Sequence, residues 1–167
     1  MAGSTTRGVV FVHSAVPALC PHVESAIARV LTTRVRLDWS VQPAAPDSLR
    51  AELPWVGPPG VSARIASALR GWQLLRFEVT EEPSPGVEGS RYCGTPSLGI
   101  FSAVTGVHGD VLVREDRLRA AMIAAAGRAG GLEEELSRLL GRPWDEELEP
   151  FRHAGEGACV RWLHAVV

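Results

Sequence analysis

Polar and apolar residues alternate along two neighbouring segments of the chain, residues 34–41 and 49–55. A period of two residues predicts two strands, each with one buried face. The proline-rich segment 43–47 is typical of the turn between them. If Gln42 pairs with Ser48, apolar residues oppose one another throughout the hairpin, whereas a slip of one residue would set apolar against polar positions. This register predicts Asp38 opposite Glu52 across the two strands.

Apolar residues recur at helical spacing before and after this hairpin and predict helices at about residues 21–32 and 61–69. Apolar strands are predicted at about residues 8–13 and 73–80. The resulting order is β-α-β-β-α-β within residues 7–82. This order predicts a ferredoxin-like half, in which one antiparallel sheet carries two helices on one face. The sequence therefore indicates an α+β protein.

The second half is less regular. Residues 83–97 contain three prolines, three glycines and three serines and predict a loop or linker. Residues 98–167 predict a smaller mixed α/β half of strand-helix-helix-strand order, packed on the first half so that the two form one compact unit. Its expected elements are strands at 98–105 and 110–113, helices at 115–126 and 132–140, an acidic irregular segment at 144–157, and a final strand at 159–166.

Bulk composition narrows the classes of function. The chain has 167 residues, a formal net charge of −2, and three cysteines without metal-type spacing. All its basic residues are arginine, a bias of the whole chain that marks no particular site. No early apolar segment resembles a signal peptide and none reaches the length of a membrane span. We expect a cytoplasmic protein with reduced thiols that binds neither nucleic acid nor membrane.

Reactive side chains are densest where the first strand meets the first helix, at His13, Cys20 and His22. Pro21 suits the first helical position, which places the Cys20 thiol beside free helix amides that favour the thiolate. These three residues are the candidates for catalysis or metal binding. The alternative interpretation makes Cys20 a small apolar core residue and leaves the histidines bonded to backbone. No cofactor or metal is assigned.

Charged residues dominate the sheet face that the predicted helices leave uncovered. Arg34, Arg36, Arg50 and Arg76 are there, together with Asp38, Glu52 and Glu78. We expect a lattice of ion pairs on this face, either solvated or covered by the C-terminal half, because surface pairs are commonly structural. The competing interpretation is an arginine-lined site for a small anionic ligand. His108 and Asp110, in a predicted turn, are further candidate ligand-binding residues.

Four segments together resemble a known family: residues 8–14, 20–24, 69–80 and 144–152. They are similar to an actinobacterial family catalogued as domain of unknown function 3145, over about residues 7–167. The absence of lysine and asparagine suits such an origin. The resemblance implies no activity, cofactor or catalytic residue.

No P-loop, dinucleotide-binding, zinc-protease or serine-hydrolase motif is present. We therefore favour a non-enzymatic cytoplasmic module that binds a ligand or a protein and has a regulatory role. An enzyme or metal-binding protein using His13, Cys20 and His22 is the alternative. A third hypothesis is docking through residues 144–151. The sequence is compatible with an oligomer.

Overall fold

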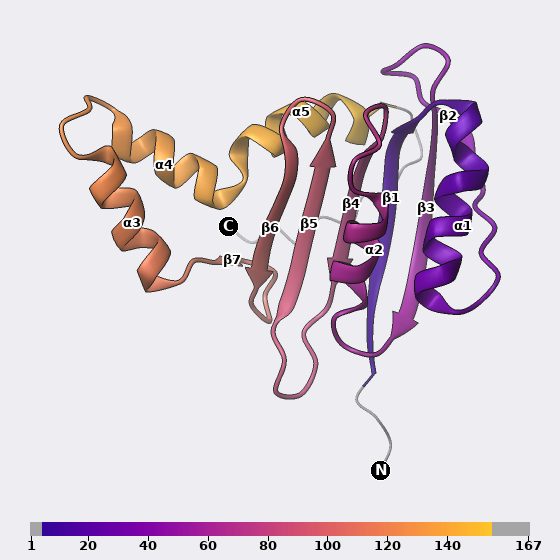
Figure 1. Cartoon of the computed structure of the whole chain (residues 1–167), viewed down its shortest axis with the longest axis horizontal. Coiled ribbons are helices and arrows are strands. Elements are labelled where there is room, and N and C mark those ends of the chain that lie inside the picture. The colour runs from indigo at the N-terminus through magenta and orange to yellow at the C-terminus, as the bar shows by residue number, and fades with distance from the viewer. Residues whose placement is uncertain (1–4, 155–167) are drawn as a thin grey trace.

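A seven-stranded antiparallel sheet forms the centre of the computed structural model, which describes residues 5–154 (Figure 1). The order across the sheet is β2-β3-β1-β4-β5-β6-β7. The strands are β1 (Thr6–Ala15), β2 (Ser40–Val41), β3 (Leu49–Gly57), β4 (Arg76–Glu81), β5 (Gly89–Thr95), β6 (Gly99–Thr105) and β7 (Val111–Leu112).

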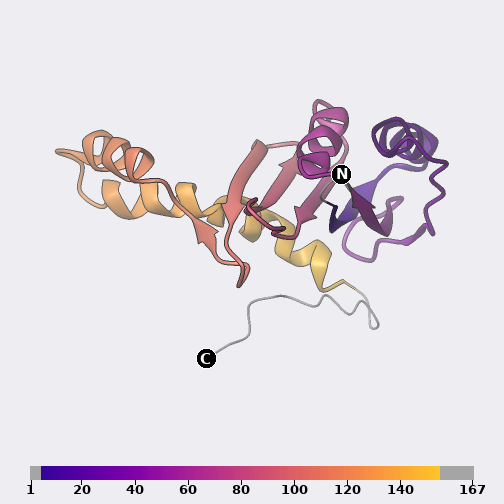
Figure 2. The ribbon, with the colours of Figure 1, turned by 90° about the horizontal axis from the view of Figure 1, so that it is seen from below.

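Helices lie on both faces of this sheet (Figure 2). A short 3-10 turn, Pro17–Leu19, leads into α1 (Cys20–Leu31), which covers one face together with α2 (Val61–Leu69). On the opposite face lies α5 (Arg142–Arg152). The remaining helices, α3 (Glu115–Ala125) and α4 (Gly131–Leu140), pack on each other and project from the β7 edge.

The main core fills the space between the sheet and helices α1 and α2. Alternate residues of β1, such as Val10 and Val12, enter this layer, as do Phe77 and Val79 of β4. Gly8 makes the packing possible at one end of β1, because a Cβ there would lie 1.9 Å from the Thr80 carbonyl oxygen. Each large apolar side chain buried in this way contributes roughly 1.5–3 kcal/mol to folding.

Glu81, at the end of β4, ties α2 to the sheet. Its carboxylate accepts hydrogen bonds from the backbone amides of Gly60 and Ser62, at 2.7 and 2.9 Å, and from the Ser62 hydroxyl. These are amides of the first helical turn, which have no partner within the helix. A strand residue thus supplies the cap that the sequence before α2 lacks.

The predicted hairpin register is confirmed, but its first strand is much shorter than predicted. The amide of Gln42 donates to the Ser48 carbonyl at 2.9 Å, and Ser40 pairs with Arg50. Residues 34–39 form no strand, so the pairing of Asp38 with Glu52 does not occur. Glu24 of α1 accepts hydrogen bonds from the Leu37 amide and the Trp39 indole instead.

Two further predictions of local structure were wrong. The predicted loop over residues 83–97 contains β5, and the predicted irregular segment at 144–157 begins with α5. The other predicted strands and helices between residues 8 and 140 are present, with ends shifted by a few residues. The final strand predicted at 159–166 lies outside the described residues.

The α+β class and the antiparallel sheet are confirmed. The ferredoxin-like arrangement of residues 7–82 stays a prediction, since β2 has only two residues and the sheet continues through three more strands beyond β4. Among residues 5–154, no helix has both the length and the apolar composition needed to cross a membrane.

Candidate functional site

A group of charged side chains is buried between the sheet and α5. Three strands contribute His13, Glu78 and Arg91, and α5 contributes Asp145 and Arg152. We call these five residues the charged cluster. The solvent-exposed fractions of His13, Glu78 and Arg152 are 7%, 5% and 3%. Charged residues are seldom buried to this extent unless they are paired.

Glu78 is the centre of the charged cluster. One carboxylate oxygen, Oε2, contacts His13 Nε2 at 2.6 Å and accepts from Arg152 Nε at 2.9 Å. The other oxygen, Oε1, accepts from Arg152 Nη2 at 2.6 Å and from Arg91 Nη2 at 2.9 Å. Arg152 therefore binds this carboxylate in the bidentate geometry that the planar guanidinium favours. Both arginines also bind Asp145.

The surroundings of Glu78 keep it ionised. Burial alone would raise the pKa of this carboxyl group, but the hydrogen bonds from His13 and Arg152 outweigh that effect and hold the pKa well below its usual range. The neighbouring Cys93 thiol donates to Glu78 Oε1 at 3.4 Å. Its burial, and next the negative charge of Glu78, raise the Cys93 pKa well above the ordinary value. Cys93 is thus a neutral thiol rather than a nucleophile.

Apolar and polar contacts fasten α5 over the charged cluster. Leu148 packs with Cys93, Phe101 and Ala103 in a second small core. Arg76 forms an ion pair with Glu147, at 3.4 Å, and lies over the Phe151 ring. The side chain of Gln42 donates to the carbonyls of both His13 and Phe151, at 2.6 and 3.2 Å. Helix α5 is therefore an integral layer of the fold.

This arrangement does not resemble an acid–base site. A catalytic carboxylate must reach its substrate and release or accept a proton near the working pH. Glu78 instead has both oxygens occupied by charged donors and a pKa far below neutrality. The charged cluster supplies a buried connection between β1, β4, β5 and α5.

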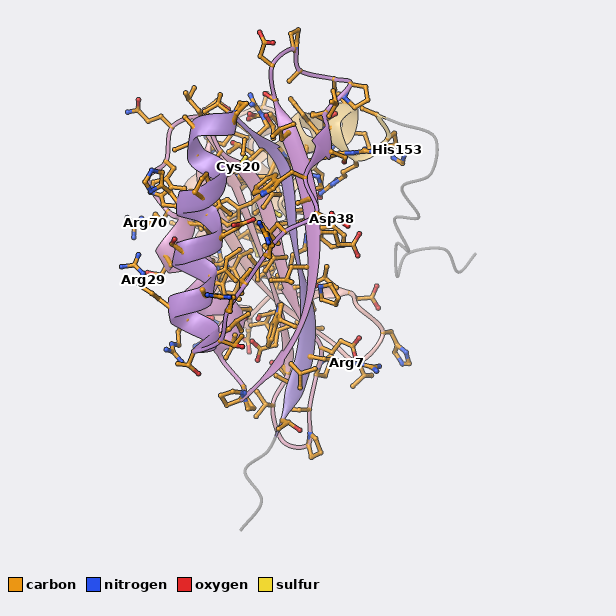
Figure 3. The ribbon with its side chains drawn as sticks, turned by 90° about the vertical axis from the view of Figure 1, so that its right-hand side faces the viewer. Arg7, Cys20, Arg29, Asp38, Arg70 and His153 are labelled. Atoms are coloured by element: carbon orange, nitrogen blue, oxygen red, sulfur yellow. The ribbon has the colours of Figure 1, made fainter. Side chains whose placement is uncertain are left out.

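The structure does not bring His13, Cys20 and His22 together. Cys20 belongs to the apolar core on the α1 side of the sheet, whereas His13 bonds to Glu78 on the α5 side. Figure 3 shows Cys20 on α1 and His153, which follows Arg152, on the opposite side of the sheet. His22 is exposed on α1. Within residues 5–154, no group of three or more His, Cys, Asp or Glu residues is placed to hold a metal ion.

The candidate thiolate at Cys20 is also not supported. Burial, followed by the nearby charge of Glu24, raises the pKa of this thiol above its ordinary value. The sulfur donates to the Val16 carbonyl at 3.7 Å. Cys20 therefore matches the alternative interpretation, in which it fills space in the core.

The arginines expected to share one sheet face are dispersed. Arg34 and Arg36 are exposed in the segment before β2. Arg50 donates to the carbonyl of Ala154, and Arg76 contacts α5. His108 and Asp110 are exposed in the turn between β6 and β7, where the Asp110 carbonyl accepts from the Gly106 amide, at 2.9 Å. Ion pairs on this face form around Glu78 and between Arg76 and Glu147, and α5 supplies a partner in both cases.

Apolar side chains are exposed on both α3 and α4. Met122 and Ile123 of α3 have exposed fractions of 63% and 77%. Leu118 of α3 and Leu132 and Leu140 of α4 are also exposed. We call these five residues the hairpin surface. Only Ala121 and Ala125 are buried on α3, so this helix hides little apolar area against the rest of the chain.

A shallow hollow of about 300 Å³ lies where α4 meets α5. Its charged lining consists of Glu133, Glu134, Glu146 and Arg142. Glu134 pairs with Arg138, and Glu146 pairs with Arg142, both within their own helices. These pairs are ordinary helix-surface contacts, and the hollow has no feature of a built ligand site.

The protein is thus an α+β protein in which α5 covers the charged cluster and the α3–α4 hairpin projects from the edge of the sheet. Residues 9–165 match the model of the family described as protein of unknown function (DUF3145). The chain belongs to this family, and the family predicted from the sequence is thereby confirmed. No curated protein and no solved structure matches the chain.

Sequence reasoning missed the charged cluster because its members are far apart in the chain. Glu78 and Arg152 are separated by 74 positions. Their partnership depends on α5, which was predicted to be irregular. The sequence did contain a signal for this helix. Trp144, Leu148 and Phe151 have helical spacing, and most of the residues between them are acidic.

Proposed function

We propose that this protein is a non-enzymatic module that binds another protein through the hairpin surface. The observation that carries this proposal is the exposure of Met122 and Ile123 on a helix that leaves the body of the fold. Exposed apolar patches rimmed by charge are typical of protein-binding sites. The burial of His13, Glu78 and Arg152 supports binding in preference to catalysis, and a regulatory role through that binding is part of the proposal.

The geometry of the hairpin favours a helical partner. Two packed helices present a groove between their side chains, and a third or fourth helix fills such a groove in ridges-into-grooves packing. Leu118 and Met122 are four residues apart on α3 and therefore lie on one face. Burying such a face would supply the apolar contact that α3 lacks within its own chain.

The finer predictions of fold and location have partial support. We infer that residues 7–82 are a ferredoxin-like unit, because β1 lies between β3 and β4 and both α1 and α2 cover the same face. We also propose the cytoplasm as the location of the protein. Cys20 and Cys93 are free thiols, which suits a reducing compartment.

The proposal is tested by affinity isolation of the tagged protein from cells that contain it naturally. We expect associated protein to be recovered with the wild type and to be lost when Met122 and Ile123 are both changed to Glu. Val41→Glu is the matched control, since Val41 is 71% exposed on β2, at the far edge of the sheet. Equal recovery with all three proteins would contradict binding through the hairpin surface.

A further inference from the structure

Part of the sheet surface on the α5 side is left uncovered by the described residues. Helix α5 crosses the strands near the upper end of the sheet in Figure 1. It extends from Trp144, which packs on Phe101 of β6, to the Ala154 carbonyl just beyond it, which accepts a hydrogen bond from Arg50 of β3. Four apolar residues lie on the same face toward the other end of β1 and β3, and we call them the open face: Val9, Phe11, Pro54 and Val56.

The register of β1 places the open face on the side of α5. Phe11 pairs with Glu78 of the charged cluster and stacks on His13, with 6.0 Å between the ring centroids. Val9 lies two residues before Phe11 and therefore on the same face, because side chains alternate along a strand. Val56 of β3 is 72% exposed, and among the described residues no member of the open face belongs to either apolar core.

We propose that the open face binds the end of this same chain, residues 159–166, which we call the C-terminal segment. The sequence predicts a strand there, and eight of the ten residues from 158 to 167 are apolar. The family match extends to residue 165, so nearly all of the C-terminal segment belongs to the domain that defines the family. Packing an apolar segment on an apolar face removes both from water, which is the main favourable term in such contacts.

The position of Ala154 favours this occupant over any unconnected one. Arg50 holds the Ala154 carbonyl on the same face of the sheet, six residues along β3 from Val56, or about 20 Å. Thirteen residues follow Ala154 and reach up to about 43 Å when extended. A segment on such a short tether has an effective concentration on the order of 1 mM, which an unconnected apolar partner would have to exceed or offset with tighter binding.

The open face suits the C-terminal segment better than the outer edge of β3 does. The Gln42 amide donates to the Ser48 carbonyl, so the backbone groups of even-numbered β3 residues point toward this edge. Among the described residues, the pairing of β2 with β3 stops at Arg50, opposite Ser40. Beyond it, Pro54 has no amide to donate to an added strand. The C-terminal segment therefore packs on the side chains of the face and does not extend the sheet.

The reactivity of a thiol at position 56 tests the inference in the full-length chain. In a Cys159→Ser background, Val56→Cys should react with a thiol reagent at least about 10-fold more slowly than Val41→Cys, although Val41 is likewise 71% exposed on β2. Adding Val160→Glu and Trp162→Glu should release the C-terminal segment, restore fast reaction at position 56 and leave position 41 unchanged. Peptide mass spectrometry assigns the rate to each cysteine, and far-UV circular dichroism checks that each variant is folded.

Hydroxyl-radical oxidation of Trp162 tests the same contact from the other side. Trp162 should be oxidised several-fold more slowly in the wild type than in a variant with Pro54→Glu and Val56→Glu, because charged side chains on the open face disfavour an apolar occupant. Val41→Glu is the matched control and should leave the oxidation of Trp162 as slow as in the wild type. Equal oxidation of Trp162 in all three proteins would contradict the contact.

Three results of the thiol experiment would overturn the inference. The first is reaction of Val56→Cys as fast as that of Val41→Cys, because the open face would then be uncovered. The second is protection of position 56 that persists with Val160→Glu and Trp162→Glu, because something else would then provide the cover. The third is protection that is lost on dilution from about 100 µM to about 1 µM, because a tethered segment protects at any concentration, whereas a second copy does not. None of these results bears on the hairpin surface, so the proposed function is decided separately.

Discussion

Removing the charge of Glu78 should destabilise this protein more than almost any other single substitution of a polar residue. Glu78→Gln keeps the size of the side chain but removes the buried carboxylate that Arg91 and Arg152 share, and leaves the partly exposed Asp145 as their remaining common partner. Breaking a buried ion pair by neutralising one partner typically costs about 3–5 kcal/mol. The upper part of this range applies if the amide cannot reorient toward His13.

The measurement is urea unfolding followed by far-UV circular dichroism. We expect the free energy of unfolding to fall by about 3–5 kcal/mol with an unchanged dependence on urea. For a chain of this length, the midpoint of thermal unfolding should fall by roughly 6–20 °C. Glu52→Gln is the control, because Glu52 is an exposed residue of β3. This substitution should change the free energy of unfolding by less than about 0.5 kcal/mol.

A double-mutant cycle separates loss of the pair from loss of the cluster. Glu78→Leu and Arg152→Met should each destabilise strongly, whereas the combined variant should lose much less than the sum, because no unpaired partner remains between these two residues. Additive losses would mean that Glu78 and Arg152 do not depend on each other. A loss below about 1 kcal/mol for Glu78→Gln would refute the view that the charged cluster holds α5 on the sheet.

Three other predictions follow from the described contacts. The fold lowers the pKa of Glu78, so the contribution of this carboxylate to stability is complete above its ordinary pKa of about 4.3 and is lost as the pH falls through the lower folded value. The free energy of unfolding should therefore depend less on pH in the acid range in Glu78→Gln than in the wild type. An identical dependence in the two proteins would contradict this. Glu24→Ala should cost about 1–3 kcal/mol and shift Trp39 fluorescence toward that of an exposed indole, since the Trp39 indole loses its acceptor; unchanged fluorescence would show that the contact is dispensable. Gly8→Ala should destabilise by about 1–3 kcal/mol or more in thermal unfolding, since the new methyl group collides with the Thr80 carbonyl; a neutral result would require β1 and β4 to lie farther apart.

The parts of the fold set by local pattern were predictable from sequence. A short apolar run identified β1, alternate apolar residues identified β3, and apolar residues at helical spacing identified α1 and α2. The pairing of Gln42 with Ser48 followed from matching apolar positions across a short turn. In each case the signal lies within about a dozen neighbouring residues, where periodicity is informative.

The errors arose where a distant contact overrides the local pattern. Residues 34–39 alternate as a strand does, but Glu24 takes up the Leu37 amide and the segment follows α1 instead of joining the sheet. Helix α5 contains Pro150, which lowers its helical signal, yet ion pairs with the sheet secure it. The hairpin surface could not be predicted either. Apolar residues at helical spacing on α3 and α4 predict that these residues are buried, whereas five of them are exposed in the structure.

Helix α5 closes the charged cluster, and an open cluster would leave Glu78 accessible to a substrate. The rate at which a thiol reagent modifies Cys93, in a variant with Cys20→Ser and Cys159→Ser, measures this closure directly. With Cys93 fully buried beside Leu148, we predict modification only through unfolding, so that its rate rises with urea in step with global instability. Modification at the rate of a free exposed cysteine under native conditions would contradict the account.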